Sequence, residues 1–135
     1  IDLLVNDFTY RAVNDGFVVL FESHFKRNYI HVRDVSKVFQ HAIKNHESMK
    51  GEIYNVGLSD ANVSKKQLCQ IIKKQLPEFI FIDEKIGRDP DQRNYIISNE
   101  KIESTGFKQE FSLDRGIGEL IKGYSMIKNS RYGNV

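Results

Sequence analysis

Apolar residues recur along the chain at two different spacings, and these spacings predict helices that alternate with strands. Segments 3–12, 33–45 and 64–76 place apolar residues three and four positions apart, as one buried face of a helix requires. The second segment has the fullest stripe, and we expect its members to be buried: Val35, Val38, Phe39, Ala42 and Ile43. A short helix is expected after Asn99. The last helix begins after Ser112, and its predicted apolar face is Leu113, Ile117, Leu120, Ile121 and Tyr124.

Short runs rich in β-branched and aromatic residues predict strands between these helices. The predicted strands are 17–22, 27–32, 51–57 and 79–82, with a further short one at 95–98. In the run 27–32, Arg27, Tyr29 and His31 are expected on one face, because side chains alternate along a strand. The polar loop 87–94 contains Pro90, which favours a turn there.

The order of these elements indicates the fold class. Strands alternate with helices along the whole chain, which predicts an α/β fold with a small mixed sheet and flanking helices. We expect a single domain over residues 1–135. Ser64 and Gln67 have the spacing of a capping box, which predicts that the third long helix begins at Ser64.

Composition narrows the function classes. The chain has 135 residues and a net charge of +2, which is too small to favour nucleic acid or an anionic membrane as a partner. The lysines at 65, 66, 73 and 74 are expected to form the solvated face of their helix. The single cysteine, Cys69, is expected to be a buried hydrophobe, and it favours a reducing compartment such as the cytoplasm. No apolar run is long enough to span a membrane.

Motifs for cofactors and metals are absent from the sequence. No glycine-rich phosphate loop occurs, and the four histidines lack metal-ligand spacing, so no metal site is expected. From its residues alone the chain is a soluble α/β domain with two arginine-bearing loops, at Arg27 and at Arg88.

Three stretches add a family resemblance. They are "RNYIHVRDV", "GEIYNVG" and the segment from "GRDPDQRNYIISNEK" through "FSLDRGIGELIKGY". In this order they resemble motifs of the extended short-chain dehydrogenase/reductase family, the NAD-dependent nucleotide-sugar epimerases and dehydratases. The chain differs from the family pattern at Asn28, Asn99 and Gln109, and in the turn "GLSDAN", which borders the nucleotide base in the family.

The resemblance implies that this chain is the C-terminal, substrate-binding part of a Rossmann-type enzyme. The preceding half, which holds NAD or NADP and the Tyr-x-x-x-Lys pair, is expected to belong to a longer parent protein. None of the six tyrosines of this chain is followed by lysine at that spacing, so no catalytic residue is expected here. The chain alone is expected to bind no cofactor and to be inactive, while the parent is expected to be a homo-oligomer.

The resemblance also implies the residues that contact a nucleotide-diphosphate sugar. Arg27 and Arg88 match arginines that reach the diphosphate, and Asp91 matches the acid that reaches the ribose. Arginine suits this role because its planar fork donates two parallel hydrogen bonds to a phosphate. The remaining matches are Leu3 and Leu4 near the nucleotide, Phe21 beside the base, and Asp60 as a polar contact.

Each of these residues also has a structural interpretation. Arg27 can form an ion pair at the end of a strand, and the "RDPD" turn can satisfy Arg88 locally. Leu3, Leu4 and Phe21 can serve core packing. At the level of the whole chain, two alternatives remain: a stand-alone module that binds a nucleotide or a partner, and a scaffold without a ligand. An exposed apolar face where the preceding half would sit favours the enzyme part over the module, and a scaffold predicts no thermal shift with any nucleotide.

Overall fold

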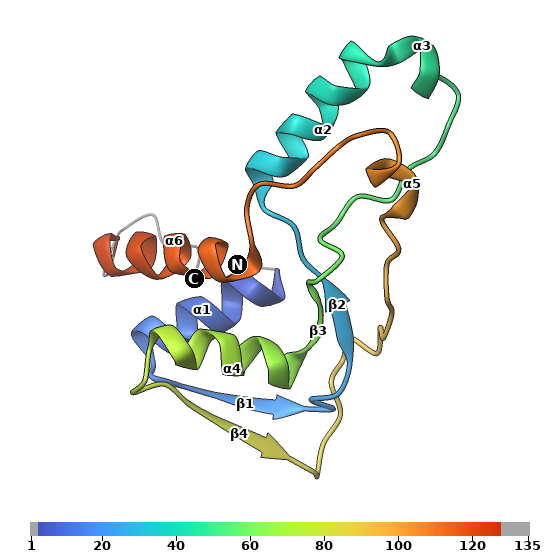
Figure 1. Cartoon of the computed structure of the whole chain (residues 1–135). Coiled ribbons are helices and arrows are strands. Elements are labelled where there is room, and N and C mark those ends of the chain that lie inside the picture. The colour runs from blue at the N-terminus through green and yellow to red at the C-terminus, as the bar shows by residue number, and fades with distance from the viewer. Residues whose placement is uncertain (1–2, 128–135) are drawn as a thin grey trace.

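The computed structural model describes residues 3–127, and helices alternate with strands along them (Figure 1). The elements are α1 (Leu4–Asn14), β1 (Phe17–Phe21), β2 (Lys26–Asn28), α2 (Val32–Lys44), α3 (His46–Met49), β3 (Asn62–Ser64), α4 (Lys65–Gln75), β4 (Ile80–Glu84), α5 (Glu100–Glu103) and α6 (Leu113–Met126). The predicted α/β class, with small sheets and flanking helices, is confirmed.

The strands pair in two separate sheets rather than in one mixed sheet. β1 runs parallel to β4, with Phe17 opposite Ile80. β2 runs antiparallel to β3, with Arg27 opposite Val63. The sequence did not predict β3, and the predicted strand 27–32 is too long. It stops early because His31 is the N-cap of α2 and its side chain accepts a hydrogen bond from the Arg33 amide.

The main core lies between the β1–β4 sheet and three helices. α1, α4 and α6 gather on one side of this sheet (Figure 1). Val18 and Leu20 of β1 are buried against them, together with Leu68 and Ile72 of α4 and Ile117 of α6. Cys69 is buried in the same core, as predicted, and burial raises the pKa of its thiol to about 12.

The start of α4 confirms one prediction and corrects another. Ser64 and Gln67 form the predicted capping box. Lys65, by contrast, is not part of a solvated face, because it is only 2% exposed. Its ammonium group donates to the Phe21 carbonyl and to the Asp89 carboxylate. A lysine in the first turn of a helix opposes the helix dipole, and here the Asp89 carboxylate compensates for it. Lys66, Lys73 and Lys74 are exposed, as expected.

α2 and α3 project from this body as an arm, with α5 beside them (Figure 1). Val38 and Ala42 of α2 pack against a second, small cluster formed by Met49, Ile102 and Phe107. The prediction of a fully buried stripe is wrong for the other side of the helix. Phe39 is 67% exposed and Ile43 is 76% exposed. The only residue of α2 that is buried is Asp34.

Two predicted strands are not present. Residues 51–57 and 95–98 lie outside both sheets. A strand needs a hydrogen-bonding neighbour, and no segment of the described chain forms a strand ladder with residues 51–57. Residues 95–98 make only isolated bonds, from the Tyr95 amide to the Lys26 carbonyl and between the Ile97 backbone and the Asn62 side chain. Among the described helices, none has the length and apolarity to cross a membrane.

Candidate functional site

Arg27 is a buried cation in the middle of the short strand β2. It is 7% exposed. Its Nη2 atom lies 3.0 Å from Asp91 Oδ1 and donates to the Asp91 carbonyl oxygen at 3.3 Å. Its Nη1 atom donates to the Lys26 carbonyl at 2.9 Å. The guanidinium carbon lies 5.4 Å from the centre of the Tyr95 ring, a distance typical of a cation–π contact. The ion pair with a carboxylate that the sequence offered as a structural interpretation of Arg27 is therefore present, although Arg27 lies in the middle of β2 and not at its end.

The loop 85–95 brings Asp91 to Arg27 across 64 residues of sequence. The carboxylate of Asp91 also accepts two hydrogen bonds from Arg93, at 2.7 Å and 2.6 Å. These bonds, followed by those from the Arg93 amide and Arg27, lower the pKa of Asp91 well below its usual value. Asp91 N donates to Asp89 Oδ1 at 2.7 Å, which confirms the predicted turn around Pro90.

The same loop covers the end of β1. Gly87 lies so close to Phe21 that a Cβ atom there would be 2.7 Å from the Phe21 ring. Lys65 ties the Phe21 carbonyl to Asp89. Arg88 is exposed, and its side chain makes no hydrogen bond or ion pair within residues 3–127. Four predicted site residues therefore gather here: Phe21, Arg27, Arg88 and Asp91. We call this group the arginine cluster.

The other predicted residues lie elsewhere. Leu3 is 66% exposed and lines an apolar groove of about 450 Å³. Leu4 is half-buried and packs against the main core rather than in the groove. Asp60 is exposed in a second hollow, of about 360 Å³, beside Glu103 and Gln109. The tertiary structure thus separates Leu4 and Asp60 from the arginine cluster.

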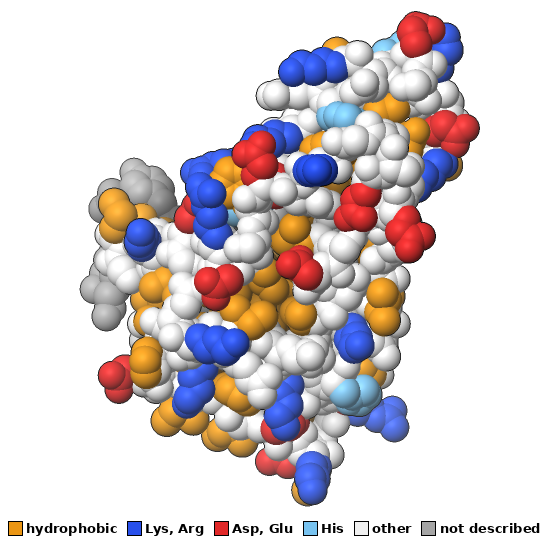
Figure 2. Space-filling model, viewed as in Figure 1, with side chains coloured by type: hydrophobic (Ala, Val, Ile, Leu, Met, Phe, Trp, Pro, Cys, Tyr) orange, Lys and Arg blue, Asp and Glu red, His pale blue; other side chains and the backbone are white. Residues whose placement is uncertain are grey.

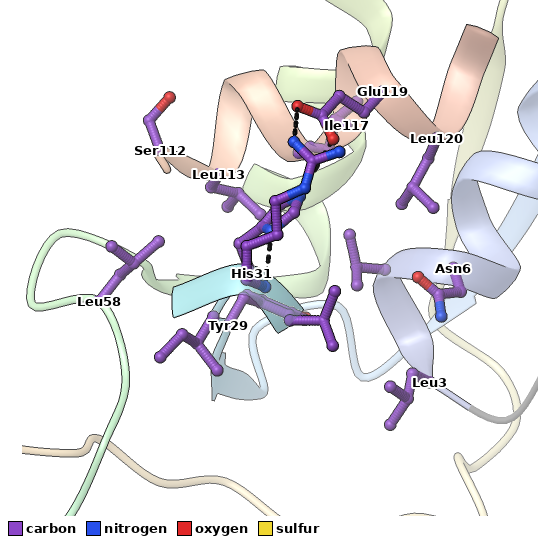
Figure 3. Close-up of a pocket in the computed structure, with 15 residues that line it drawn as sticks. Leu3, Asn6, Tyr29, His31, Leu58, Ser112, Leu113, Ile117, Glu119 and Leu120 are labelled. Atoms are coloured by element: carbon purple, nitrogen blue, oxygen red, sulfur yellow. Dashed lines mark hydrogen bonds and ion pairs between the residues drawn. The ribbon is translucent and has the colours of Figure 1, made fainter. Parts of the chain in front are cut away.

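The apolar groove lies between the start of α1, the start of α2 and one face of α6 (Figure 3). His31 Nε2 lies 3.2 Å from Glu119 Oε2, and Arg33 lies 3.2 Å from the other oxygen of the same carboxylate. Burial alone raises the pKa of Glu119, but Arg33, His31 and Arg115 outweigh it, so the pKa is lowered. The groove therefore has an apolar floor and one polar side, on which the Glu119 carboxylate is paired with Arg33 and His31.

Two tyrosines near Arg27 were missed as site residues. Tyr29 lines the groove, and its buried hydroxyl has no hydrogen-bond partner within residues 3–127. Burial raises the pKa of this hydroxyl, so it stays protonated and can donate. The alternation of strand residues already placed Tyr29 on the same face as Arg27, and that signal could have identified it. Tyr95 had no such signal, because only the folded loop places it over Arg27.

The lowered pKa of Asp91 predicts how stability responds to acid. A carboxyl group whose folded-state pKa is depressed stabilises the protein above its unfolded-state pKa, which is about 3.9 for aspartate. That contribution disappears as the pH falls below about 4 through the folded-state pKa. We expect the urea midpoint of the wild type to fall more steeply below pH 4 than that of Asp91→Asn.

The control for this measurement is Asp60→Asn, because Asp60 is exposed and forms no ion pair within the described chain. This variant should follow the wild-type pH dependence. Identical slopes for the wild type and Asp91→Asn would show that the pairing of Asp91 with Arg27 and Arg93 contributes nothing to stability.

Known proteins share both sequence and fold with this chain. The dTDP-D-glucose 4,6-dehydratase of Mus musculus is 30% identical over 105 residues, which are 73% of this chain and 29% of the mouse protein. RMD from Pseudomonas aeruginosa, solved with NADPH, superposes with a TM-score of 0.73 at 14% identity, over 92% of this chain and 43% of its own. The UDP-glucose 4-epimerase of Thermotoga maritima, solved with UDP-glucose, has a TM-score of 0.71 at 23% identity, over 92% and 40% of the two chains. No family model matches the chain.

These matches show the class of protein to which the fold belongs. The chain has the fold of one part of Rossmann-type NAD(P)-dependent enzymes, and it spans less than half the length of each of these relatives. The resemblance to the extended short-chain dehydrogenase/reductase family, the nucleotide-sugar epimerases and dehydratases, is thereby confirmed.

Proposed function

We propose that this chain is the substrate-binding part of an NAD(P)-dependent nucleotide-sugar epimerase or dehydratase. In this role Arg27 and Arg88 hold the diphosphate, Asp91 contacts the ribose, and Phe21 packs beside the base. Leu3 contributes exposed apolar surface near the nucleotide, whereas Leu4 packs against the main core and Asp60 is a more distant polar contact. The whole parent protein carries the catalytic tyrosine and the cofactor.

The buried Arg27 is the observation that supports this proposal most. A buried guanidinium is costly unless it is paired, and burial makes each of its hydrogen bonds stronger. Asp91 supplies the negative charge that Arg27 faces in this structure. A diphosphate offers more oxygens than one carboxylate, so it can replace Asp91 at Arg27 while Asp91 keeps its bonds to Arg93.

Holding the nucleotide contributes to catalysis by positioning. If the diphosphate and base are fixed on this chain, the sugar carbon can be presented to a reactive group at a defined place. The residues of this chain do not fit NAD(P) itself, since the sequence has no glycine-rich dinucleotide loop. The cofactor is therefore assigned to the preceding half, and no chemical step is assigned to the residues described above.

The alternative is a stand-alone module, derived from such an enzyme, that captures a nucleotide. The coding sequence upstream of Ile1 separates the two. A glycine-rich loop followed by Tyr-x-x-x-Lys before Ile1 supports the enzyme part. A start codon shortly before Ile1 supports the module, and nucleotide capture then becomes the whole function.

Nucleotide titration of the wild-type chain tests the proposal directly. We expect UDP, dTDP, GDP or ADP to bind at least about 10-fold more tightly than the matching monophosphate. The reason is that one further charge-assisted hydrogen bond contributes roughly 1.5–3 kcal/mol. Calorimetry at low and high salt gives the constants. Equal affinity for diphosphate, monophosphate and nucleoside would contradict the assignment of Arg27 and Arg88 to the diphosphate.

A further inference from the structure

The loop 85–95 carries two of the predicted site residues, Arg88 and Asp91, but it has no buried side chain to anchor it. Only Asp89 and Asp91 are partly buried, and Ile86 is 85% exposed. At the end of β4, where this loop begins, Figure 2 shows basic and acidic side chains close together on the surface. A segment without buried apolar side chains opens locally at little cost unless polar contacts hold it. The contacts that hold this loop therefore decide where Arg88 and Asp91 lie.

Asp89 connects the loop to two other segments of the chain. Its Oδ2 atom accepts a hydrogen bond from the Lys65 ammonium group, and its amide donates to Glu22 Oε2 at 3.0 Å. Its second carboxylate oxygen, Oδ1, accepts from the amide of Asp91 at 2.7 Å. Asp89 is therefore held from α4 and from the residue that follows β1. Through the bond to its amide it also constrains Asp91, whose carboxylate faces Arg27.

Lys65 is the buried member of these contacts. Its side chain is 3% exposed, whereas that of Asp89 is 21% exposed. Its ammonium group also donates to the Phe21 carbonyl and lies 5.3 Å from the centre of the Phe25 ring. A buried ammonium group is costly unless it is paired. Within residues 3–127 its only ion pair is with Asp89, so movement of the loop away from α4 would leave a buried charge unpaired.

Glu22 holds the same loop although its own backbone conformation is unfavourable. Its φ of +48° is the only positive value at a non-glycine residue of the described chain. Such strain persists where the surrounding contacts impose it. The Glu22 carboxylate accepts hydrogen bonds from the Asp89 amide, at 3.0 Å, and from the Gln92 side chain, at 2.8 Å. The strained residue thus binds the loop directly, as Lys65 does from α4.

We propose that Lys65 and Glu22 are positioning residues, which fix the loop 85–95 in the conformation that presents Arg88 and Asp91 to a nucleoside diphosphate. The inference rests on the proposed function, which assigns Arg88 and Asp91 to the nucleotide, and it adds the residues that order them before binding. A loop that is already ordered loses less conformational entropy when the ligand binds, so the affinity rises without a further contact.

Burial favours this role over a direct contact between Lys65 and a phosphate. An ammonium group has three N–H donors, and two of them are used by the Phe21 carbonyl and the Asp89 carboxylate. Arg88, by contrast, is exposed, so it is the cation that a ligand approaching from solvent meets first. Lys65 therefore acts through Asp89.

Hydrogen exchange of the Asp89, Asp91 and Arg93 amides tests whether the loop is fixed in this way. Lys65→Met keeps most of the length of the side chain and removes its charge. Glu22→Gly removes the carboxylate and suits a φ of +48°, so its backbone is not strained there. In both variants we expect these amides to exchange at least about 10-fold faster than in the wild-type chain. Unchanged exchange in either variant would overturn the assignment of that residue, and unchanged exchange in both would overturn the whole inference.

Calorimetric titration of the same variants tests the effect on binding. With the nucleoside diphosphate that binds the wild type best, we expect the dissociation constant to rise at least about 10-fold in Lys65→Met. The matched control is Lys66→Met, because Lys66 is the next residue of α4, is exposed and pairs with Asp83 at 3.0 Å. This control should leave both the loop exchange and the affinity unchanged. Faster loop exchange with wild-type affinity in Lys65→Met would overturn the positioning role.

Asp89→Asn separates positioning from a direct phosphate contact. It breaks the ion pair and leaves Lys65 charged, so the positioning role predicts weaker binding, as in Lys65→Met. The double variant should bind about as weakly as the single variants, because the two side chains act as one unit. If Asp89→Asn binds as tightly as the wild type while Lys65→Met binds weakly, Lys65 is itself a phosphate ligand and the inference is overturned.

The two measurements also separate this inference from the proposed function. If the loop amides respond to Lys65→Met and Glu22→Gly but the wild type binds no nucleoside diphosphate, the fixing of the loop stands and the substrate role fails. If the wild type binds the diphosphate and the loop amides do not respond, the substrate role stands and the inference fails.

Discussion

Arg27→Ala is expected to lose the binding of a nucleoside diphosphate by about 100-fold or more. The guanidinium supplies at least two charge-assisted hydrogen bonds, each contributing roughly 1.5–3 kcal/mol. A loss of about 1.4 kcal/mol is a factor of ten in the dissociation constant, so even the lower estimate gives a large effect. Calorimetric titration with the diphosphate that binds the wild type best measures it.

Three further variants show whether a loss of affinity in Arg27→Ala comes from a lost phosphate contact. Arg11→Ala removes an arginine that pairs with Asp7 on the exposed face of α1, and it should leave binding unchanged. Arg27→Lys keeps the charge and loses the fork, so it should recover only a part of the affinity. Arg88→Ala should weaken binding without destabilising the fold, because Arg88 is exposed and unpaired within residues 3–127. Wild-type affinity in Arg27→Ala would contradict the proposed phosphate contact.

Asp34→Ala is expected to be the most destabilising single change that the structure indicates. The side chain is fully buried, with 0% exposure, at the first turn of α2. Its two carboxylate oxygens accept hydrogen bonds from the amides of Glu110 and Phe111, at 3.0 Å each. These bonds tie the base of the arm to the segment that leads into α6. Alanine leaves one buried donor, the Phe111 amide, and one partly buried donor, the Glu110 amide, without an acceptor.

The expected cost follows from those two donors. An unsatisfied buried N–H costs about 1–3 kcal/mol, and the partly buried Glu110 amide adds a smaller cost, so Asp34→Ala should lower the free energy of unfolding by at least roughly 1–3 kcal/mol. Urea denaturation followed by circular dichroism measures it. Asp34→Asn keeps one acceptor oxygen and should cost less. Asp15→Ala, at the exposed end of α1, is the control and should change stability little. An unfolding free energy equal to that of the wild type in Asp34→Ala would show that the Asp34 bonds contribute nothing.

Both sets of variants separate folding from function. Asp34 does not belong to the arginine cluster, since its carboxylate binds the Glu110 and Phe111 amides, and its loss should reduce the folded fraction without changing the affinity of the folded molecules. Arg27 is expected to affect both, because its removal also frees Asp91 from an ion pair. Measuring the affinity and the unfolding free energy of each variant therefore distinguishes a ligand contact from a purely structural ion pair.

Local sequence was enough to predict most helices and the class of the fold. α4 begins at Ser64 with both halves of its capping box, and α1 and α6 lie within a few residues of their predicted bounds. These features depend on neighbours three or four positions away, so a single sequence contains them. The family resemblance could also be recognised from the sequence, because the three motifs keep the order and spacing that they have in the family.

The tertiary structure decided what depends on contacts between distant segments. The pairing of Arg27 with Asp91 joins residues 64 positions apart. Lys65 can be buried because its ammonium group donates to both the Phe21 carbonyl and the Asp89 carboxylate. No periodicity reports such contacts. Likewise, the strand predicted at 51–57 has no partner strand in the described chain, and the apolar stripe of α2, which was predicted to be buried, is exposed at Phe39 and Ile43.

The difference has one physical reason. By itself the sequence determined which segments are helical, which are extended and which faces are apolar, since those properties follow from backbone geometry and side-chain spacing. Only the tertiary structure decided which apolar faces find a partner in this chain and which charges meet, because burial and ion pairing require a second segment at the right place. The exposed residues Phe39, Ile43 and Ile53 are where the sequence calls for a partner that the described chain does not supply.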